Sequence, residues 1–255
     1  IKRAAKAVVK AERVLTGAKE ETRDLYFRAV NRSAYQEVRR QRNFDTVVQK
    51  AIDELPEEVN EEPVEEDWMA YFFEQVKDIS NEEMQNLWAK LLAGEVAEPG
   101  TYTLRTLNFV RTLMKDEASL FTKYCSYVCR IEGTSTLARL WNEDANEFMA
   151  KEGMPLNAAQ HLENIGLTNV RKFSLPFQDE ESKICIDYFG RKYILRKPSA
   201  GQRWQTHIGA GAFDLLTSVG NELFPICGAE PDWKYLECLI GSLPNDGIEV
   251  ERIES

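Results

Sequence analysis

Apolar residues in the first 54 positions recur with the spacing of a helix. They lie mostly three or four positions apart, in a stretch that contains no proline and a single glycine, Gly17. Alanine, lysine, arginine, glutamate and glutamine, which favour helices, are frequent throughout. The pattern predicts a helix over residues 2–54 with a break at Thr16–Gly17. A narrow apolar stripe on so long a helix is typical of a helix that packs against another helix or forms a coiled-coil arm.

Residues 55–67 differ from the segments on either side. The sequence LPEEVNEEPVEED holds two prolines, Pro56 and Pro63, which stop helices. Its closely spaced carboxylates repel one another and oppose compact packing. We therefore predict an acidic linker here.

Helical spacing returns over residues 68–132. A helix in the middle of this segment is expected to end at Gly94, and Pro99–Gly100 makes a turn. A last helix is expected from Lys115 to about Arg130. Four helices joined by short links predict a compact bundle.

After residue 132 the pattern becomes mixed. Helices are predicted at 142–151 and 156–165, and the second ends at Gly166. Strand-like segments follow, at 171–177, 183–189 and 192–196. A strand is expected at 212–216, a short helix capped by Thr217 at 217–223, another helix at 231–240 and a closing strand at 248–253. Two helices, a glycine stop and a β-hairpin, in this order, outline a winged-helix unit.

The predicted fold is therefore mainly α with a smaller α+β part. Its segments are a basic long-helix arm (1–54), an acidic linker (55–67), a helical bundle (68–132) and a winged-helix-like domain with a β-hairpin (133–255). Charge follows this division: residues 1–50 carry 13 Lys and Arg against 6 Asp and Glu, and residues 51–100 carry 2 against 15. The two stretches can attract each other within the chain or bind separate partners.

Composition narrows the class of protein. Hydrophobic residues make up 43% of the chain and charged residues 29%, which is ordinary for a soluble globular protein. No run approaches the roughly 20 apolar residues of a membrane helix, so no membrane segment is predicted. The first residues are basic and lack the apolar stretch of a secretory signal, which favours the cytoplasm. The chain begins at Ile1 instead of methionine, so we expect a natural N-terminal piece to precede it.

The sequence shows no arrangement of residues that is typical of catalysis. It lacks a phosphate-binding loop, a dinucleotide fingerprint, a zinc-protease motif and a nucleophile elbow. Its two histidines, His161 and His207, have no partner at a recognisable spacing. The five cysteines are odd in number and widely spaced, which favours reduced thiols in a cytosolic protein. We therefore predict no catalytic residue, no cofactor and no metal site.

The predicted hairpin region carries the strongest candidate surface. Residues 171–205 hold eight basic residues and four acidic ones, in a chain of net charge −10. The basic residues are Arg171, Lys172, Lys183, Arg191, Lys192, Arg196, Lys197 and Arg203. Basic side chains with interleaved aromatic ones can bind phosphates and stack on bases. The alternative is an ordinary hairpin with inward aromatic rings and solvated cations, or a surface for a protein partner.

The segment Leu87–Leu107, LWAKLLAGEVAEPGTYTLRTL, resembles an uncharacterised bacterial family, a domain of unknown function. The upstream IKRAAKA and LPEEVNEEPVEEDW and the later HLENIGLT and FDLLTSVGNEL share this resemblance. The later segments are also similar to Abi-alpha-type abortive-infection proteins. The family implies no catalytic residues, and we interpret its signature as structural. The signature residues are Trp88, Leu91, Leu92, Gly94, Pro99, Gly100 and Arg105.

These observations lead to three functional hypotheses. The first is a non-enzymatic bacterial interaction or scaffold protein, with a protein partner or self-association through the N-terminal helix and a role in phage defence that the resemblance implies. The second is a winged-helix nucleic-acid-binding protein that uses the basic hairpin at 171–205. The third is an enzyme with an unfamiliar site among buried carboxylates.

Overall fold

A computed structural model describes residues 20–132, 137–155, 157–169, 183–196, 212–246 and 248–253. The chain divides into two compact units, residues 1–97 and 98–255. This division differs from the segments expected from the sequence. The first two helices of the bundle predicted over 68–132 belong to the first unit, and the last two belong to the second.

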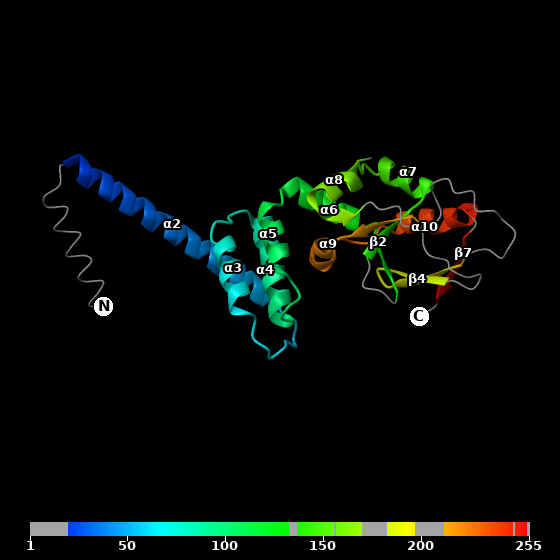
Figure 1. Cartoon of the computed structure of the whole chain (residues 1–255), viewed down its shortest axis with the longest axis horizontal. Helices are drawn as coiled ribbons and strands as arrows, with labels where there is room; N and C mark the ends of the chain where they lie inside the picture. The colour runs from blue at the N-terminus through cyan, green and yellow to red at the C-terminus, as the bar shows by residue number, and fades with distance from the viewer. Residues whose placement is uncertain are drawn as a thin grey trace. The chain divides into compact units, whose positions relative to one another are not determined.

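The first unit contains three described helices, α2 (Glu20–Asp53), α3 (Glu66–Val76) and α4 (Glu82–Ala97) (Figure 1). The predicted end of the first long helix is confirmed within one residue, whereas its expected start and the break at Thr16–Gly17 lie outside the described residues. The last third of α2 packs on α3 and α4 and buries Asn43, Val47 and Ala51.

Aromatic side chains form the core of the first unit. The rings of Trp68 and Phe72 are stacked with centroids 5.2 Å apart, and Trp88 meets Phe72 edge-on at 5.5 Å. Phe72 and Trp88 are fully buried. Each such ring pair contributes about 0.5–1.5 kcal/mol beyond the burial of its apolar area. This aromatic core therefore supports the C-terminal end of α2.

The end of α4 corrects the prediction from the sequence. Gly94 lies inside the helix, which continues to Ala97. A single glycine within a helix costs only about 1 kcal/mol relative to alanine, whereas Pro99 disfavours the helical conformation at Glu98. Proline, and not glycine, therefore sets the end of this helix. Gly100 then takes a positive φ of 89° in the turn.

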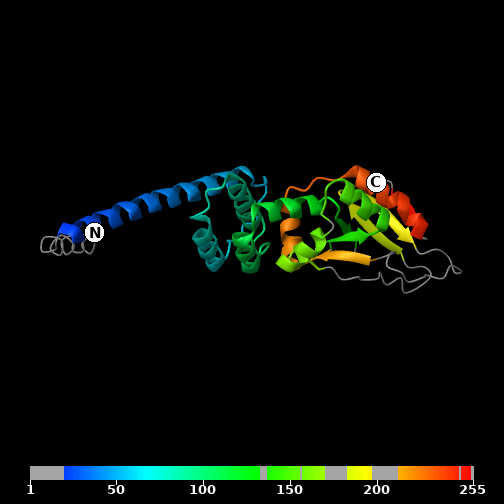
Figure 2. The ribbon, with the colours of Figure 1, turned by 90° about the horizontal axis from the view of Figure 1, so that it is seen from above.

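The second unit is built on an antiparallel sheet. Its described strands are β1 (Cys129–Ile131), β2 (Leu137–Trp141), β3 (Thr168–Asn169), β4 (Lys183–Tyr188), β5 (Arg191–Arg196), β6 (Ala212–Leu216) and β7 (Glu249–Ile253). They lie in the order β3-β6-β2-β1-β4-β5-β7, and every neighbouring pair is antiparallel. Figure 2 shows this unit from above.

The second unit also contains six described helices. They are α5 (Leu104–Thr112), α6 (Lys115–Cys125), α7 (Glu143–Lys151), α8 (Ala158–Ile165), α9 (Ser218–Leu223) and α10 (Trp233–Ser242), with short 3₁₀ turns η1 (Phe224–Ile226) and η2 (Leu243–Asp246). The predictions of α7, α8, α9 and α10 are confirmed, as is the stop at Gly166, whose φ is 93°. The hydroxyl of Thr217 accepts a hydrogen bond from the Gly220 N–H at 3.1 Å and caps α9, as predicted.

Helix α6 is shorter than predicted. It ends at Cys125, five residues before the expected end at Arg130, and the chain then enters β1. Tyr127, Val128 and Ile131 belong to the aromatic and β-branched types that favour strands. Pairing with both β2 and β4 stabilises β1, so the chain forms a strand here and does not extend α6.

The predicted hairpin is confirmed, but its setting differs from a winged-helix unit. β4 and β5 pair over six residues around a turn at Phe189–Gly190. The hairpin lies inside the sheet, between β1 and β7, and does not stand alone as a wing. The α+β character is confirmed and the winged-helix assignment is not. The strand predicted at 171–177 lies outside the described residues.

Candidate interaction surfaces

The first part of α2 exposes large apolar side chains. Six of the ten large apolar side chains that are exposed among the described residues lie here: Leu25, Tyr26, Phe27, Val30, Tyr35 and Val38, with exposed fractions of 40–74%. All described residues of α2 before Arg40 are exposed, and this part of the helix extends beyond α3 and α4 (Figure 1). Single exposed apolar residues are common, but a contiguous group of this kind marks an interaction site.

Helical spacing places most of these side chains on one face. Tyr26, Phe27, Val30, Ala34 and Val38 follow one another at intervals of one, three or four residues, so they lie along one side of the helix. We call these five residues the α2 stripe. All described residues of α2 before Arg40 are exposed, and a helix in a protein owes most of its stability to the packing of an apolar face. Burying the α2 stripe would remove its apolar side chains from water and would also stabilise the helix.

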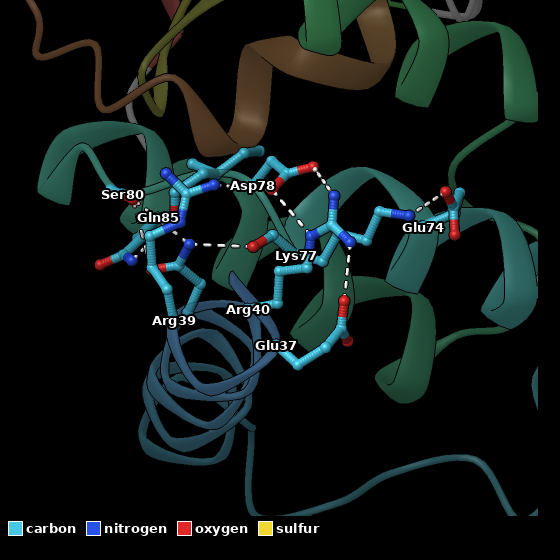
Figure 3. A network of polar contacts seen from close by, with 10 residues as sticks. Glu37, Arg39, Arg40, Glu74, Lys77, Asp78, Ser80 and Gln85 are labelled. Atoms are coloured by element: carbon cyan, nitrogen blue, oxygen red, sulfur yellow. Dashed lines mark hydrogen bonds and ion pairs between the residues drawn. The ribbon is translucent and has the colours of Figure 1, made fainter. Parts of the chain in front are cut away.

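A polar network fixes α2 where its supported part begins (Figure 3). Asp78, in the loop between α3 and α4, accepts hydrogen bonds from Arg39 Nη2 at 2.9 Å and from Arg40 Nε at 3.1 Å. Arg40 also bonds Glu37 at 2.9 Å. One helical turn further, Asn43 donates to the carbonyl of Lys77 at 2.9 Å. These contacts hold the exposed part of α2 at a defined angle from the aromatic core.

The hydrogen bond from Arg40 lowers the pKa of Asp78 below its ordinary value of 3.8. Both side chains are partly exposed, 31% for Arg40 and 45% for Asp78, so solvent screens the pair and it contributes little stability. Its role is therefore to orient α2, because a bidentate arginine–carboxylate contact defines direction better than a single contact does.

Three of the four basic residues described in the predicted hairpin contact other side chains of the same chain. Lys192 Nζ lies 2.5 Å from a Glu132 oxygen, and Arg196 Nη2 lies 2.8 Å from Glu251. The guanidinium of Arg191 lies over the ring of Trp233, 3.8 Å from its centroid. Lys183, the fourth basic residue described in the hairpin, is exposed. Arg171, Lys172, Lys197 and Arg203 lie outside the described residues.

The sheet face around the hairpin is balanced in charge. Strand pairing places six charged residues of β4, β5 and β7 on one face, three basic and three acidic: Lys183, Lys192, Arg196, Asp187, Glu249 and Glu251. A phosphate-binding surface needs an excess of positive charge. The described part of this face has none.

A family model covers residues 27–240 of this chain, which is most of its length. The family is described as a protein of unknown function, DUF2806. The chain belongs to the DUF2806 family. This confirms the predicted membership of an uncharacterised domain family. No curated protein and no solved structure matches the chain.

The DUF2806 match contains the signature segment and most of the α2 stripe. Trp88, Leu91 and Leu92 are buried on α4, at 0%, 0% and 6% exposure, as an apolar packing face would be. Pro99 and Gly100 lie at the turn after α4, and Arg105 is an exposed residue of α5. The signature residues of α4 therefore stabilise the aromatic core that supports α2.

The second unit of this DUF2806 chain contains a buried ion pair that was not predicted from the sequence. Arg139 on β2 binds Asp214 on β6, with Nε 3.0 Å from Oδ2, and both side chains are 6% exposed. The Tyr124 hydroxyl donates to the same carboxylate at 3.2 Å, and Arg139 also donates to Asn146 at 2.5 Å. Burial raises the pKa of Tyr124, which keeps its hydroxyl a neutral donor.

The signal for this pair was present in the sequence. A single charged residue stands among apolar ones in LARLW and in AFDLL, and two such strands can neutralise each other only if they are neighbours. The cluster is satisfied internally and holds β2, β6, α6 and α7 together.

The described part of the chain carries no candidate metal cluster and no candidate membrane-spanning helix. No group of three or more His, Cys, Asp or Glu side chains in that part of the chain could hold a metal ion. None of its helices combines the length and the apolar character needed to cross a membrane.

Proposed function

We propose that the protein works by binding a protein chain along the α2 stripe. The observation that carries this proposal is the exposure of Tyr26, Phe27, Val30 and Val38, 40–56% each, on a helix that extends beyond its supporting core. Burying half-exposed aromatic and branched side chains is a large source of binding free energy. The anchor at Asp78 supports the proposal because it presents the α2 stripe in a fixed direction.

The proposal keeps the expectation from the sequence that the protein is an interaction component and not an enzyme. Its link to phage defence stays a prediction from sequence resemblance. The alternative, nucleic-acid binding by a winged-helix hairpin, is less favoured. Lys192 and Arg196 would have to exchange carboxylate partners at 2.5 and 2.8 Å for phosphates. Such an exchange lowers the gain from each phosphate contact.

Site-specific photo-crosslinking in living cells tests the proposal. A photoreactive phenylalanine analogue replaces Phe27 or Val30 in the α2 stripe. The matched control places it at Gln36, which is exposed on the opposite side of the same helix. We expect protein adducts from positions 27 and 30 and few from position 36. Equal labelling at all three positions, or no adducts at any of them, would overturn the proposal.

A further inference from the structure

We infer that the α2 stripe binds the α2 stripe of a second copy of this chain, with the two helices antiparallel. This inference rests on the proposed function and names the partner. The stripe is self-complementary in size, because an antiparallel pair places the large ring of Phe27 against the smaller Val38 of the second copy. A twofold contact between identical surfaces is the commonest form of association between soluble chains.

The distribution of charge along α2 selects the antiparallel direction. In its first turns Glu20, Glu21 and Asp24 outnumber the single Arg23, and further along arginines prevail, with Arg28, Arg32, Arg39, Arg40 and Arg42 against Glu37 and Asp45. In a parallel pair, each acidic end would lie beside an acidic end and each basic segment beside a basic one. In an antiparallel pair, each acidic end lies beside a basic segment. Electrostatic repulsion therefore disfavours the first arrangement and attraction favours the second.

One register satisfies both the apolar and the charged residues. With the twofold axis between the levels of residues 32 and 33, Phe27 lies opposite Val38 of the second copy, and Val30 and Ala34 lie within one residue of the same level. Asp24 and Arg42 are separated by about five full helical turns, so they lie on the same flank of α2. In this register, Asp24 of each copy lies beside Arg42 of the other. Both side chains are exposed in the single chain.

The available area fits a reversible dimer. The four large apolar side chains of the α2 stripe, Tyr26, Phe27, Val30 and Val38, are about half exposed, so they offer roughly 300–400 Å² per copy. A pair would bury about 600–800 Å² of apolar side chain, which is in the range of weak, transient interfaces. We therefore expect an equilibrium that shifts between monomer and dimer as the protein concentration changes.

Sedimentation equilibrium of the full chain tests the inference, with the variants Asp24→Arg, Arg42→Asp and the double exchange. Each single reversal puts like charges side by side twice in the dimer and should weaken association about tenfold. The double exchange restores opposite charges and should recover most of the wild-type affinity. The matched control, Arg32→Asp, reverses a charge on the opposite side of the helix and should have a smaller effect. Circular dichroism confirms that each variant keeps its helix content.

The outcomes separate this inference from the proposed function. A parallel pair would be strengthened by Asp24→Arg, because that change places an arginine among acidic residues, and this result would overturn the antiparallel arrangement. A wild-type chain that stays monomeric, but forms adducts with another protein from positions 27 and 30, would overturn the inference and leave the proposed function standing. A monomer that forms no adducts would overturn both. Failure of the double exchange to restore association would also refute the register.

Discussion

Replacing Asp214 by asparagine should strongly destabilise the second unit. The change keeps the size of the side chain and removes the charge that balances Arg139. Because both side chains are only 6% exposed, the guanidinium would remain buried without a counter-charge. Breaking a buried ion pair from one side costs about 3–5 kcal/mol, a large part of the roughly 5–15 kcal/mol that stabilises a typical domain. The midpoint of urea unfolding should fall by roughly 2 M.

Two matched variants show whether burial is the cause. Glu147→Gln removes an exposed ion pair with Lys151, whose side chains are 65% and 71% exposed, and should leave the midpoint of urea unfolding almost unchanged. The double variant Arg139→Met with Asp214→Leu removes both charges and should recover more than half of the lost stability. An Asp214→Asn midpoint close to the wild-type value, or a double variant no more stable than the single one, would refute the reasoning.

Three further predictions concern packing, acidity and thiol chemistry. Gly220→Ala should destabilise the protein by about 1–3 kcal/mol in thermal unfolding, because the new Cβ would lie 2.3 Å from a backbone oxygen, whereas Gly241→Ala, with no atom within 4 Å, should be neutral or stabilising. Arg40 lowers the pKa of Asp78 below 3.8, so the small contribution of this ion pair to the free energy of unfolding should be present above pH 4 and should disappear as the pH falls further. Asp78→Asn should therefore change the free energy of unfolding at pH 7 but not at the acid end of a pH series. Burial raises the pKa of Cys129 to about 12, so this thiol should resist iodoacetamide at pH 8 until the protein is unfolded, as peptide mass spectrometry can measure.

Local structure was the most predictable part of this protein. The α9 cap at Thr217 and the left-handed stop at Gly166 depend on interactions within a few residues, and the sequence predicts both correctly. The β4–β5 hairpin is also local, because its two strands join through the two-residue turn at Phe189–Gly190. Such features are encoded where they occur.

Features that depend on distant pairing were not predictable in the same way. β1 lies where the sequence predicts the end of a helix, and it forms because β2 and β4 pair with it. The partners of the basic hairpin residues also depend on distant pairing. Lys192 pairs with Glu132, which directly follows β1 and lies 60 residues away in the sequence. Arg196 pairs with Glu251 on β7, which lies 55 residues away. Charge counted within one segment cannot reveal a neutralising partner in another.

The α2 stripe depends on both the local sequence pattern and distant tertiary contacts. Its apolar spacing and its net positive charge are visible in the sequence, and they predict a helix that packs on another helix. Which part of α2 is already covered depends on tertiary contacts. The structure places the last third of α2 on α3 and α4, and leaves the part before Arg40 exposed.

The molar mass of the full chain in solution, measured by light scattering over a wide range of protein concentration, tests the central claim most directly. For the wild-type chain, we predict a mass that rises from 29.3 kDa toward twice that value as the concentration increases. For a variant with Phe27→Ser and Val30→Ser, we predict 29.3 kDa throughout. A wild-type mass that stays at 29.3 kDa, or a variant that associates as well as the wild type, would contradict the account.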